Sequence, residues 1–245
     1  MTRLFTLSHV TFGYDRERPA IRDLSMEVDS DETLLLAGAN GSGKTTLLKI
    51  LDGLLFPSAG EVSFEGQLLT RSRLDDRGFN RFFRQRVALL FQNPEVQLFH
   101  PTVAEDVAFG PVQLGLGPAE VKQRVEDVLR LMAVERLAPA SVLDLSEGEK
   151  QRVALATVLA VNPDVLLLDE PIAALDPKAT RLTCELIASL KAAGKTIVVA
   201  THDLDRFRML ADRVVVLGTN GSVLAGGPAA EVLGDLALLE QADLV

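Results

Sequence analysis

The sequence predicts an α/β domain with a mostly parallel sheet, and two observations support this expectation. Beyond residue 162, strand patterns at 165–169 and 196–200 alternate with helix patterns at 178–193 and 204–210. The segment 165–169 is apolar until its last residue, as expected of a strand that is buried on both faces. Strands that alternate with helices in this way form parallel sheets with helices on both sides.

The N-terminal part has a different pattern, in which short strands follow one another with glycine and polar residues between them. One helix is expected among these strands, at 44–54, directly after a glycine-rich loop. The expected strands cover 5–12, 20–28, 33–37, 61–64 and 87–91.

The middle of the chain has the period of helices. Apolar residues recur on one helical face at Val121, Val125, Val128, Leu129 and Met132. We therefore expect a helical subdomain over about 93–161, inserted into a single domain that spans 1–245. A C-terminal helical region is expected over about 229–245, with its clearest pattern at 229–241, as a cap on the domain or a docking surface.

Composition narrows the class of protein. Apolar residues make up 47% of the chain and charged residues 24%, as in a globular protein rather than a disordered one. The formal net charge of −9, without a dense lysine and arginine stripe, argues against nucleic acid as a partner. The lone Cys184 fits a reducing compartment, and the first residues resemble a strand rather than an export signal.

No run of the sequence approaches the length of a membrane span. The longest nearly apolar run, 153–161, has about half of the roughly 20 residues that a spanning helix needs. If the chain works at a membrane, another subunit must cross that membrane.

A glycine-rich loop follows the expected strand 33–37 and opens the expected helix 44–54. In this setting the backbone N–H groups of such a loop surround phosphates, helped by the positive end of the helix dipole. Lys44 would contact the β- and γ-phosphates, and Thr45 would offer its hydroxyl to Mg²⁺. The predicted phosphate-binding residues are Gly38, Ala39, Asn40, Gly41, Ser42, Gly43, Lys44, Thr45 and Thr46.

Polar residues at two other strand ends complete the predicted site. Asp169 and Glu170 follow the apolar strand 165–169, at the carboxyl edge where ligands bind in parallel sheets. Asp169 is suited to hold Mg²⁺, and Glu170 to orient and deprotonate an attacking water. His202 follows the strand 196–200, so it should lie at the same edge and sense the γ-phosphate or the water.

Together these residues resemble the ATP-binding subunits of ABC transporters, because residues 145–152 read Leu-Ser-Glu-Gly-Glu-Lys-Gln-Arg, similar to the Leu-Ser-Gly-Gly-Gln signature of that family. The resemblance covers about residues 4–227. It implies a P-loop NTPase core with N-terminal antiparallel strands and an inserted helical subdomain. It also implies a dimer in which Ser146 and Gly148 contact ATP that is bound to the other subunit.

The same resemblance assigns roles to three further residues. Tyr14 is similar to the aromatic residue that stacks on adenine. Gln92 is similar to the glutamine that links Mg²⁺ to the transmembrane partner, and it would take part in catalysis. Asp176 is similar to the aspartate that communicates between subunits. The expected ligands are ATP and Mg²⁺, bound on the cytoplasmic face of the cell membrane by a peripheral subunit of a homodimer or heterodimer.

The signature departs from the family pattern at two positions. Glu147 replaces a glycine and Glu149 replaces a glutamine. Both would add negative charge near a γ-phosphate, where like charges about 10 Å apart repel by on the order of 1 kcal/mol. We therefore expect weaker closure of the dimer than in relatives with the usual residues.

A narrower resemblance lies in residues 91–99 and 102–111, which are similar to the energy-coupling-factor branch and especially to its cobalt and nickel importers. In that branch a short tail helix, here 233–244, contributes to dimer contacts. Residues 92–99 would receive a coupling helix of an integral membrane subunit, with Val96, Leu98 and Phe99 exposed.

Several functions remain open at this point. Cobalt is the first candidate cargo, followed by nickel and by a vitamin such as biotin. A DNA-maintenance ATPase would share the nucleotide site, but it would need long coiled coils, and 93–161 lacks a heptad run of that length. In a signalling switch of the same nucleotide-binding class, residues 145–152 and His202 would have no purpose.

Overall fold

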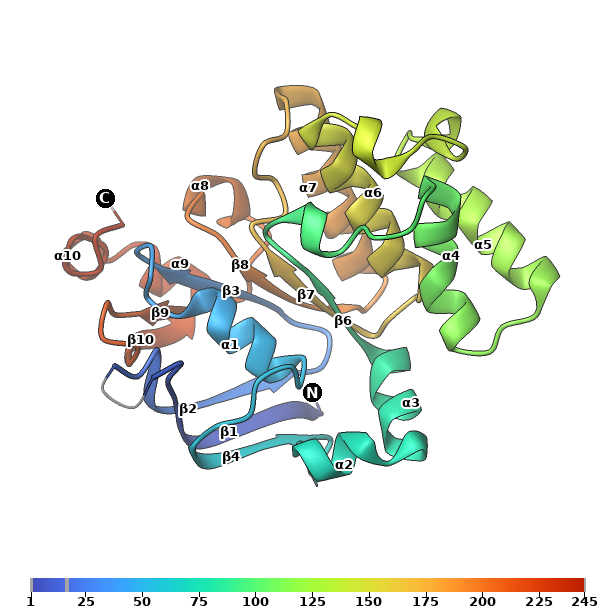
Figure 1. The fold of residues 1–245 in the computed structure, drawn as a ribbon. Helices are drawn as coiled ribbons and strands as arrows, with labels where there is room; N and C mark the ends of the chain where they lie inside the picture. The colour runs from blue at the N-terminus through green and yellow to red at the C-terminus, as the bar shows by residue number, and fades with distance from the viewer. Residues whose placement is uncertain (1, 16–17, 245) are drawn as a thin grey trace.

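Two sheets and the helices around them organise the chain, as seen in the computed structural model, which describes residues 2–15 and 18–244 (Figure 1). The larger sheet has the strand order β10-β9-β3-β8-β7-β6. Five of its strands are parallel and only β10 is antiparallel, which confirms the predicted mostly parallel sheet. Its strands are β3 (Thr33–Gly38), β6 (Val87–Leu90), β7 (Val165–Asp169), β8 (Thr196–Ala200), β9 (Arg213–Leu217) and β10 (Val223–Pro228).

The smaller sheet is antiparallel and has the order β2-β1-β4-β5. It contains the N-terminal strands, as the family resemblance implied. Its strands are β1 (Arg3–Phe12), β2 (Ile21–Asp29), β4 (Ala59–Phe64) and β5 (Gln67–Leu68).

Helices connect the strands and cover the larger sheet. Helix α1 lies between the two sheets, whereas α6 and α7 lie on the opposite face of the larger one (Figure 1). The helices are α1 (Lys44–Leu51), α2 (Arg71–Asp75), α3 (Arg77–Arg86), α4 (Val103–Gln113), α5 (Pro118–Leu131), α6 (Glu147–Ala160), α7 (Pro177–Ala192), α8 (Leu204–Phe207), α9 (Ala229–Val232) and α10 (Leu236–Gln241). Short 3₁₀ turns are η1 (Pro94–Val96), η2 (Glu135–Leu137) and η3 (Val142–Asp144). No helix within the described residues is long and apolar enough to cross a membrane.

The alternation of side chains along β3 divides the interior into two cores. Leu34 and Leu36 pack into the core between the sheets, and Leu35 and Ala37 pack into the core under the helices of the other face. All four side chains are fully buried. A strand with both faces covered has no exposed side to vary, which is why this segment reads as continuously apolar.

Several predicted element bounds were wrong. Helix α1 ends at Leu51 rather than at 54, and α8 ends at Phe207 rather than at 210. The tail is not one helix over 229–241 but the short α9 and α10, separated around Gly234. Strands β9 and β10 were missed.

Helices α2 and α3 were also missed, because their apolar side chains are few and stand among arginines. Six arginines lie in these two helices, so the expectation of no dense arginine stripe was wrong. Two of these six arginines form ion pairs with carboxylates of the chain. Arg84 pairs with Asp52, and Arg86 pairs with Glu65 and Asp164.

The contact between α1 and α3 includes a buried acid. Asp52 is only 4% exposed, and its Oδ2 accepts a hydrogen bond of 2.8 Å from Arg84 Nη1. Burial raises the pKa of Asp52 from 3.8 to about 6, against the opposing influence of the Arg84 charge. In the folded chain the neutral form of Asp52 is therefore favoured below about pH 6.

This shift predicts a pH dependence of folding. Because the folded pKa lies above the unfolded one, the stabilising contribution of protonated Asp52 is complete below about pH 4 and is lost as the pH rises through 6. Between those limits wild type should lose on the order of 3 kcal/mol relative to Asp52→Asn. Urea unfolding of both proteins at pH 4 and pH 7 measures this, and an equal difference at the two pH values would contradict it.

Candidate functional site

The glycine-rich loop turns sharply between β3 and α1. Gly43 has a φ of 101°, in the left-handed region that favours glycine, and it directly precedes the helix. The Lys44 ammonium folds back across the loop, where its Nζ donates to Gly38 O at 2.6 Å and to Ala39 O at 3.0 Å. Burial lowers the pKa of Lys44, and the nearby Glu170 and Asp169 carboxylates oppose this shift.

Asp169 at the end of β7 faces the start of α1. The Thr45 hydroxyl donates to Asp169 Oδ2 at 2.7 Å. Burial raises the pKa of Asp169; the Thr45 hydrogen bond lowers it and the neighbouring Glu170 charge raises it further. A hydroxyl and a carboxylate in contact provide the hard oxygen ligands that Mg²⁺ prefers, so these residues fit that ion.

Glu170 lies at the point where β7 ends and the chain turns. Its φ of 49° is uncommon for a residue other than glycine, and such strained backbone often occurs at functional sites. Glu170 Oε2 accepts a hydrogen bond of 3.0 Å from the Thr201 hydroxyl. Its Oε1 lies 2.9 Å from His202 Nδ1 and accepts from the His202 N–H at 3.1 Å. The structure thus brings Glu170 and His202 together, as the strand ends predicted.

These groups surround one cavity of about 360 Å³. Tyr14 lies at its edge, with its ring against Phe12 at 5.2 Å in an edge-to-face arrangement and its hydroxyl 3.3 Å from the Thr46 hydroxyl. The ring is largely exposed, so it can offer a face to a flat ligand. The cavity is lined by Tyr14, Ala20, Asn40, Gly41, Gly43, Lys44, Thr45, Thr46, Gln92, Asp169 and Glu170.

The signature residues do not line this cavity. Ser146 caps the start of α6, and Gly148 follows in its first turn. Asp176 caps α7 and accepts hydrogen bonds from the backbone N–H groups of Lys178 and Ala179. Those bonds, that of Ala179 above all, lower the pKa of Asp176. The chain therefore carries two separate sets of predicted nucleotide contacts.

Both unusual carboxylates of the signature are paired within the chain. Glu149 accepts from the Ser146 hydroxyl at 2.8 Å and from Arg136 Nη2 at 2.6 Å. The hydrogen bonds from Ser146 lower the pKa of Glu149. Glu147 lies 3.6 Å from the Lys150 ammonium. The expected repulsion of a phosphate is therefore weaker than two unpaired carboxylates would produce.

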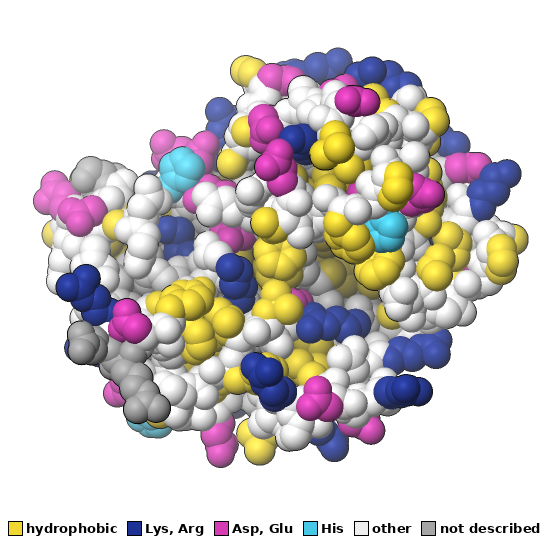
Figure 2. Space-filling view, in the orientation of Figure 1, with side chains coloured by type: hydrophobic (Ala, Val, Ile, Leu, Met, Phe, Trp, Pro, Cys, Tyr) yellow, Lys and Arg dark blue, Asp and Glu magenta, His cyan; other side chains and the backbone are white. Residues whose placement is uncertain are grey.

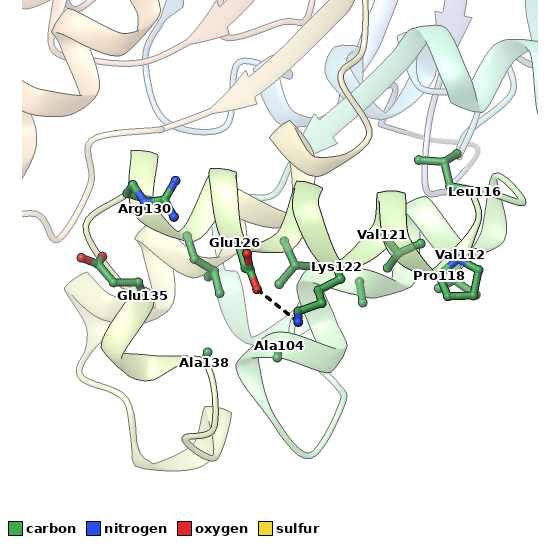
Figure 3. Close-up of a pocket in the computed structure, with 13 residues that line it drawn as sticks. Ala104, Val112, Leu116, Pro118, Val121, Lys122, Glu126, Arg130, Glu135 and Ala138 are labelled. Carbon is green, nitrogen blue, oxygen red and sulfur yellow. Dashed lines mark ion pairs between the residues drawn. The ribbon is translucent and has the colours of Figure 1, made fainter.

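A larger cavity, of about 700 Å³, lies elsewhere, between α4 and α5 (Figure 3). Its walls are mostly apolar, and Lys122 and Glu126 form an ion pair at its rim, 3.9 Å apart. None of the predicted phosphate or metal ligands contributes to it. The chemistry of nucleotide binding therefore points to the smaller cavity.

Sequence reasoning missed two residues of the site. Thr201 is fully buried and donates to Glu170, and its position between β8 and His202 could have revealed it. Ala20 lines the cavity without a chemical group that would mark it in the sequence.

Comparison with known proteins agrees with this geometry. A family model described as ABC transporter matches residues 21–173. A nickel import ATP-binding protein of Rhodobacter capsulatus is 46% identical over 100% of this chain and 97% of its own length. A cobalt import ATP-binding protein of the same organism is 43% identical, over 100% and 85%. A dimeric ATP-binding cassette, solved after hydrolysis with ADP and phosphate, superposes with a TM-score of 0.84 at 29% identity, over 92% of this chain and 99% of that one.

The fold and the family match define a class of protein, and the chain belongs to the ABC transporter family. Within that family it is an ATP-hydrolysing subunit of an importer.

The loop geometry predicts a difference between two glycines. In Gly43→Ala the new Cβ would lie 2.5 Å from Ala20 O, in a left-handed backbone, so ATP affinity should fall by about ten-fold or more. Gly41 also has a positive φ, of 81°, but nothing lies within 4 Å of its Cβ position. Gly41→Ala should therefore cost only about 1 kcal/mol of backbone strain. Titration with a fluorescent ATP analogue, together with thermal melting, compares the two, and equal losses would contradict this account.

Proposed function

We propose that this chain binds Mg²⁺-ATP and works as a dimer that powers the uptake of cobalt or nickel ions by integral membrane subunits. One observation carries the proposal: Lys44 and Thr45 from one part of the sequence, and Asp169 and Glu170 from another, surround a single cavity. A phosphate-binding loop, metal ligands and a general base are the parts that hydrolysis of a nucleoside triphosphate requires.

Binding uses the loop and its neighbours. The N–H groups of the loop and the start of α1 hold the phosphates, and Lys44 turns from the Gly38 and Ala39 carbonyls to the β- and γ-phosphates. Thr45 and Asp169 would hold Mg²⁺, with Gln92 close by, and the ion would neutralise charge that develops on the phosphates. Tyr14 stacks on the adenine.

Hydrolysis uses the Glu170 carboxylate. Its hydrogen bonds with Thr201 and His202 fix the orientation of the side chain. From there it orients a water molecule for attack on the γ-phosphorus and accepts its proton, while the bond from the γ-phosphorus to the bridging oxygen breaks and ADP leaves. His202 contacts the γ-phosphate as well as Glu170, so the position of the Glu170 carboxylate depends on whether the γ-phosphate is present.

A dimer completes the site in this proposal. Ser146 and Gly148 lie outside the cavity of their own chain, so they are free to contact ATP that is bound to a facing subunit. The structural likeness to a dimeric cassette supports this arrangement. The facing subunit is either a second copy or a related ATPase.

Cobalt or nickel is proposed as the cargo because relatives that match almost the full length are named for import of these ions. The resemblance of residues 91–99 and 102–111 to the energy-coupling-factor branch supports the same choice. The longest helix within 93–161 has 14 residues among those described, so a DNA-maintenance ATPase with long coiled coils is disfavoured. The chain would lie on the cytoplasmic face of the membrane.

The surface for the membrane subunit is proposed at η1 and the start of α4. Val96 is 63% exposed and Phe99 is 64% exposed, as predicted, but Leu98 is buried at 7% because it packs into the core under α4 and α6. Phe99 also contacts His100 and Phe109. His100 also lies against Phe109, at 5.0 Å between ring centres. Figure 2 shows a histidine side chain that is surrounded by apolar side chains on the face in view. A charge at Leu98 would therefore damage folding, and Phe99 is the better probe of coupling.

Phe99→Asp should abolish metal uptake by the complex and leave ATP binding by the isolated chain unchanged, because the residue is exposed and lies outside the nucleotide cavity. Leu131→Asp is a matched control, since Leu131 is also exposed, at the end of α5. Cellular uptake of radioactive cobalt and nickel by complexes with either variant measures the effect. Normal uptake with Phe99→Asp would remove the coupling assignment.

Glu170→Gln should lower the ATPase rate by about 10²-fold or more, because it removes the base and keeps the shape. ATP should still bind, since the loop, Thr45 and Asp169 are intact, and the chain should accumulate as a closed dimer. Steady-state ATPase rates and size-exclusion elution with Mg²⁺-ATP measure both outcomes, with exposed Glu185→Gln on α7 as the control. Near-normal turnover without a stable dimer would refute the role of Glu170.

A further inference from the structure

An ion pair joins the segment after Gln92 to the start of the signature helix. Lys150 lies in the first turns of α6, and its Nζ is 2.5 Å from Glu95 Oε1 in η1. The Lys150 side chain is only 13% exposed. The hydrogen bond with Glu95 is the main cause that raises the pKa of Lys150. The two residues are 55 positions apart, so this contact exists only in the folded chain.

Lys150 has an unfavourable place within its own helix. A cation near a helix N-terminus is repelled by the positive end of the helix dipole. The positive charge of Lys150 therefore has to be stabilised by carboxylates, and two carboxylates lie within ion-pair distance. Glu95 belongs to η1, whereas Glu147, at 3.6 Å, belongs to the signature itself. If η1 moves away, Glu147 can take over the ammonium.

A second, uncharged link holds the same segment to the middle of α6. Gln97 Nε2 donates to Ala154 O at 2.9 Å and to the Thr157 hydroxyl at 2.6 Å. Its Oε1 accepts from the Phe91 N–H at 3.2 Å. The Gln97 hydrogen bonds hold this segment against the middle of α6. Of the two contacts, the Lys150–Glu95 ion pair is the one at the end of α6 that carries Ser146.

The signature helix also contacts the residues that follow Glu170. Gln151, next to Lys150, is buried, and its Nε2 donates to Pro171 O at 3.4 Å. A cavity of about 350 Å³ lies where these parts meet, lined by Gln92, Asn93, Pro94, Glu95, Glu147, Gln151, Ala173 and Ala174. The start of α6 is thus in contact both with the segment after Gln92 and with the segment after Glu170.

We propose that Lys150 is a positioning residue that exchanges between Glu95 and Glu147, so that the position of residues 93–97 sets how Ser146 meets ATP on the facing subunit. In this account Glu147, which replaces the family glycine, is the alternative ion-pair partner of the Lys150 ammonium. The inference rests on the proposed ATP-driven dimer. It assigns regulation of that dimer to a contact outside the nucleotide cavity.

The test uses the Glu170→Gln chain, in which ATP should hold the dimer closed. Lys150→Met and Glu95→Gln are added singly and together, and dimer affinity with Mg²⁺-ATP is measured by analytical ultracentrifugation. Each dimer contains two Lys150–Glu95 ion pairs, one in each chain, so each single change should weaken association by about ten-fold. The double change should weaken it no more than Lys150→Met alone, because the contact that Glu95→Gln removes is already lost in Lys150→Met. Lys150→Arg should retain most of the affinity.

Two further measurements separate positioning from a general structural effect. Binding of a fluorescent ATP analogue to the monomer should be unchanged in all variants, since neither residue belongs to the phosphate loop. The Lys122→Met and Glu126→Gln pair on α5 removes a longer and more exposed ion pair, in which no signature residue takes part, and should leave dimer affinity unchanged.

The outcomes distinguish the two proposals. A Glu170→Gln chain that stays monomeric with ATP would overturn the proposed dimer and this inference with it. A stable dimer with unchanged affinity after Lys150→Met would overturn this inference alone. Additive losses from the two changes, or an equal loss of nucleotide binding by the monomer, would overturn it as well.

Discussion

The parallel register of β3, β8 and β7 is the constraint on which the site depends. Leu36 of β3 and Asp169 of β7 both pair with Ala200 of β8. The three strands therefore end at one edge, and the loop after β3, the acids after β7 and the residues after β8 must meet there. The backbone N–H of Glu170 donates to Ala200 O at 2.8 Å, which ties the turn after β7 to its neighbour. A slip of one residue would separate these groups.

Burial on both faces of the sheet gives that edge its electrostatic character. Asp169 and Lys44 are both buried, and burial raises the pKa of the acid and lowers the pKa of the amine. Each charge is therefore tolerated mainly because opposite charges and hydrogen bonds lie close by. Thr45 donates a hydrogen bond to Asp169, and the loop carbonyls accept hydrogen bonds from Lys44. Phosphate and metal can replace these partners with contacts of the same kind.

The charges at the start of the signature helix α6 are stabilised differently, because carboxylates and cations pair there on a partly exposed surface. Glu149 caps the helix through Ser146 and is paired with Arg136, and Lys150 joins η1. Exposed pairs of this kind contribute little to stability, about 0 to 1 kcal/mol each. They exchange partners at low cost, which would suit a surface that closes on another subunit and reopens, as in the proposed dimer.

The sequence alone determined the parts that depend on local chemistry. Glycines in 38–43 permit the left-handed turn, the segment 165–169, apolar until Asp169, favours a buried strand, and residues after strand ends lie at one edge of a parallel sheet. Tertiary structure decided whatever depends on neighbours distant in the chain. Leu98 is buried, Glu149 is neutralised by Arg136, and Lys150 meets Glu95, because packing of α6 against η1 and η2 creates surroundings that no local pattern encodes.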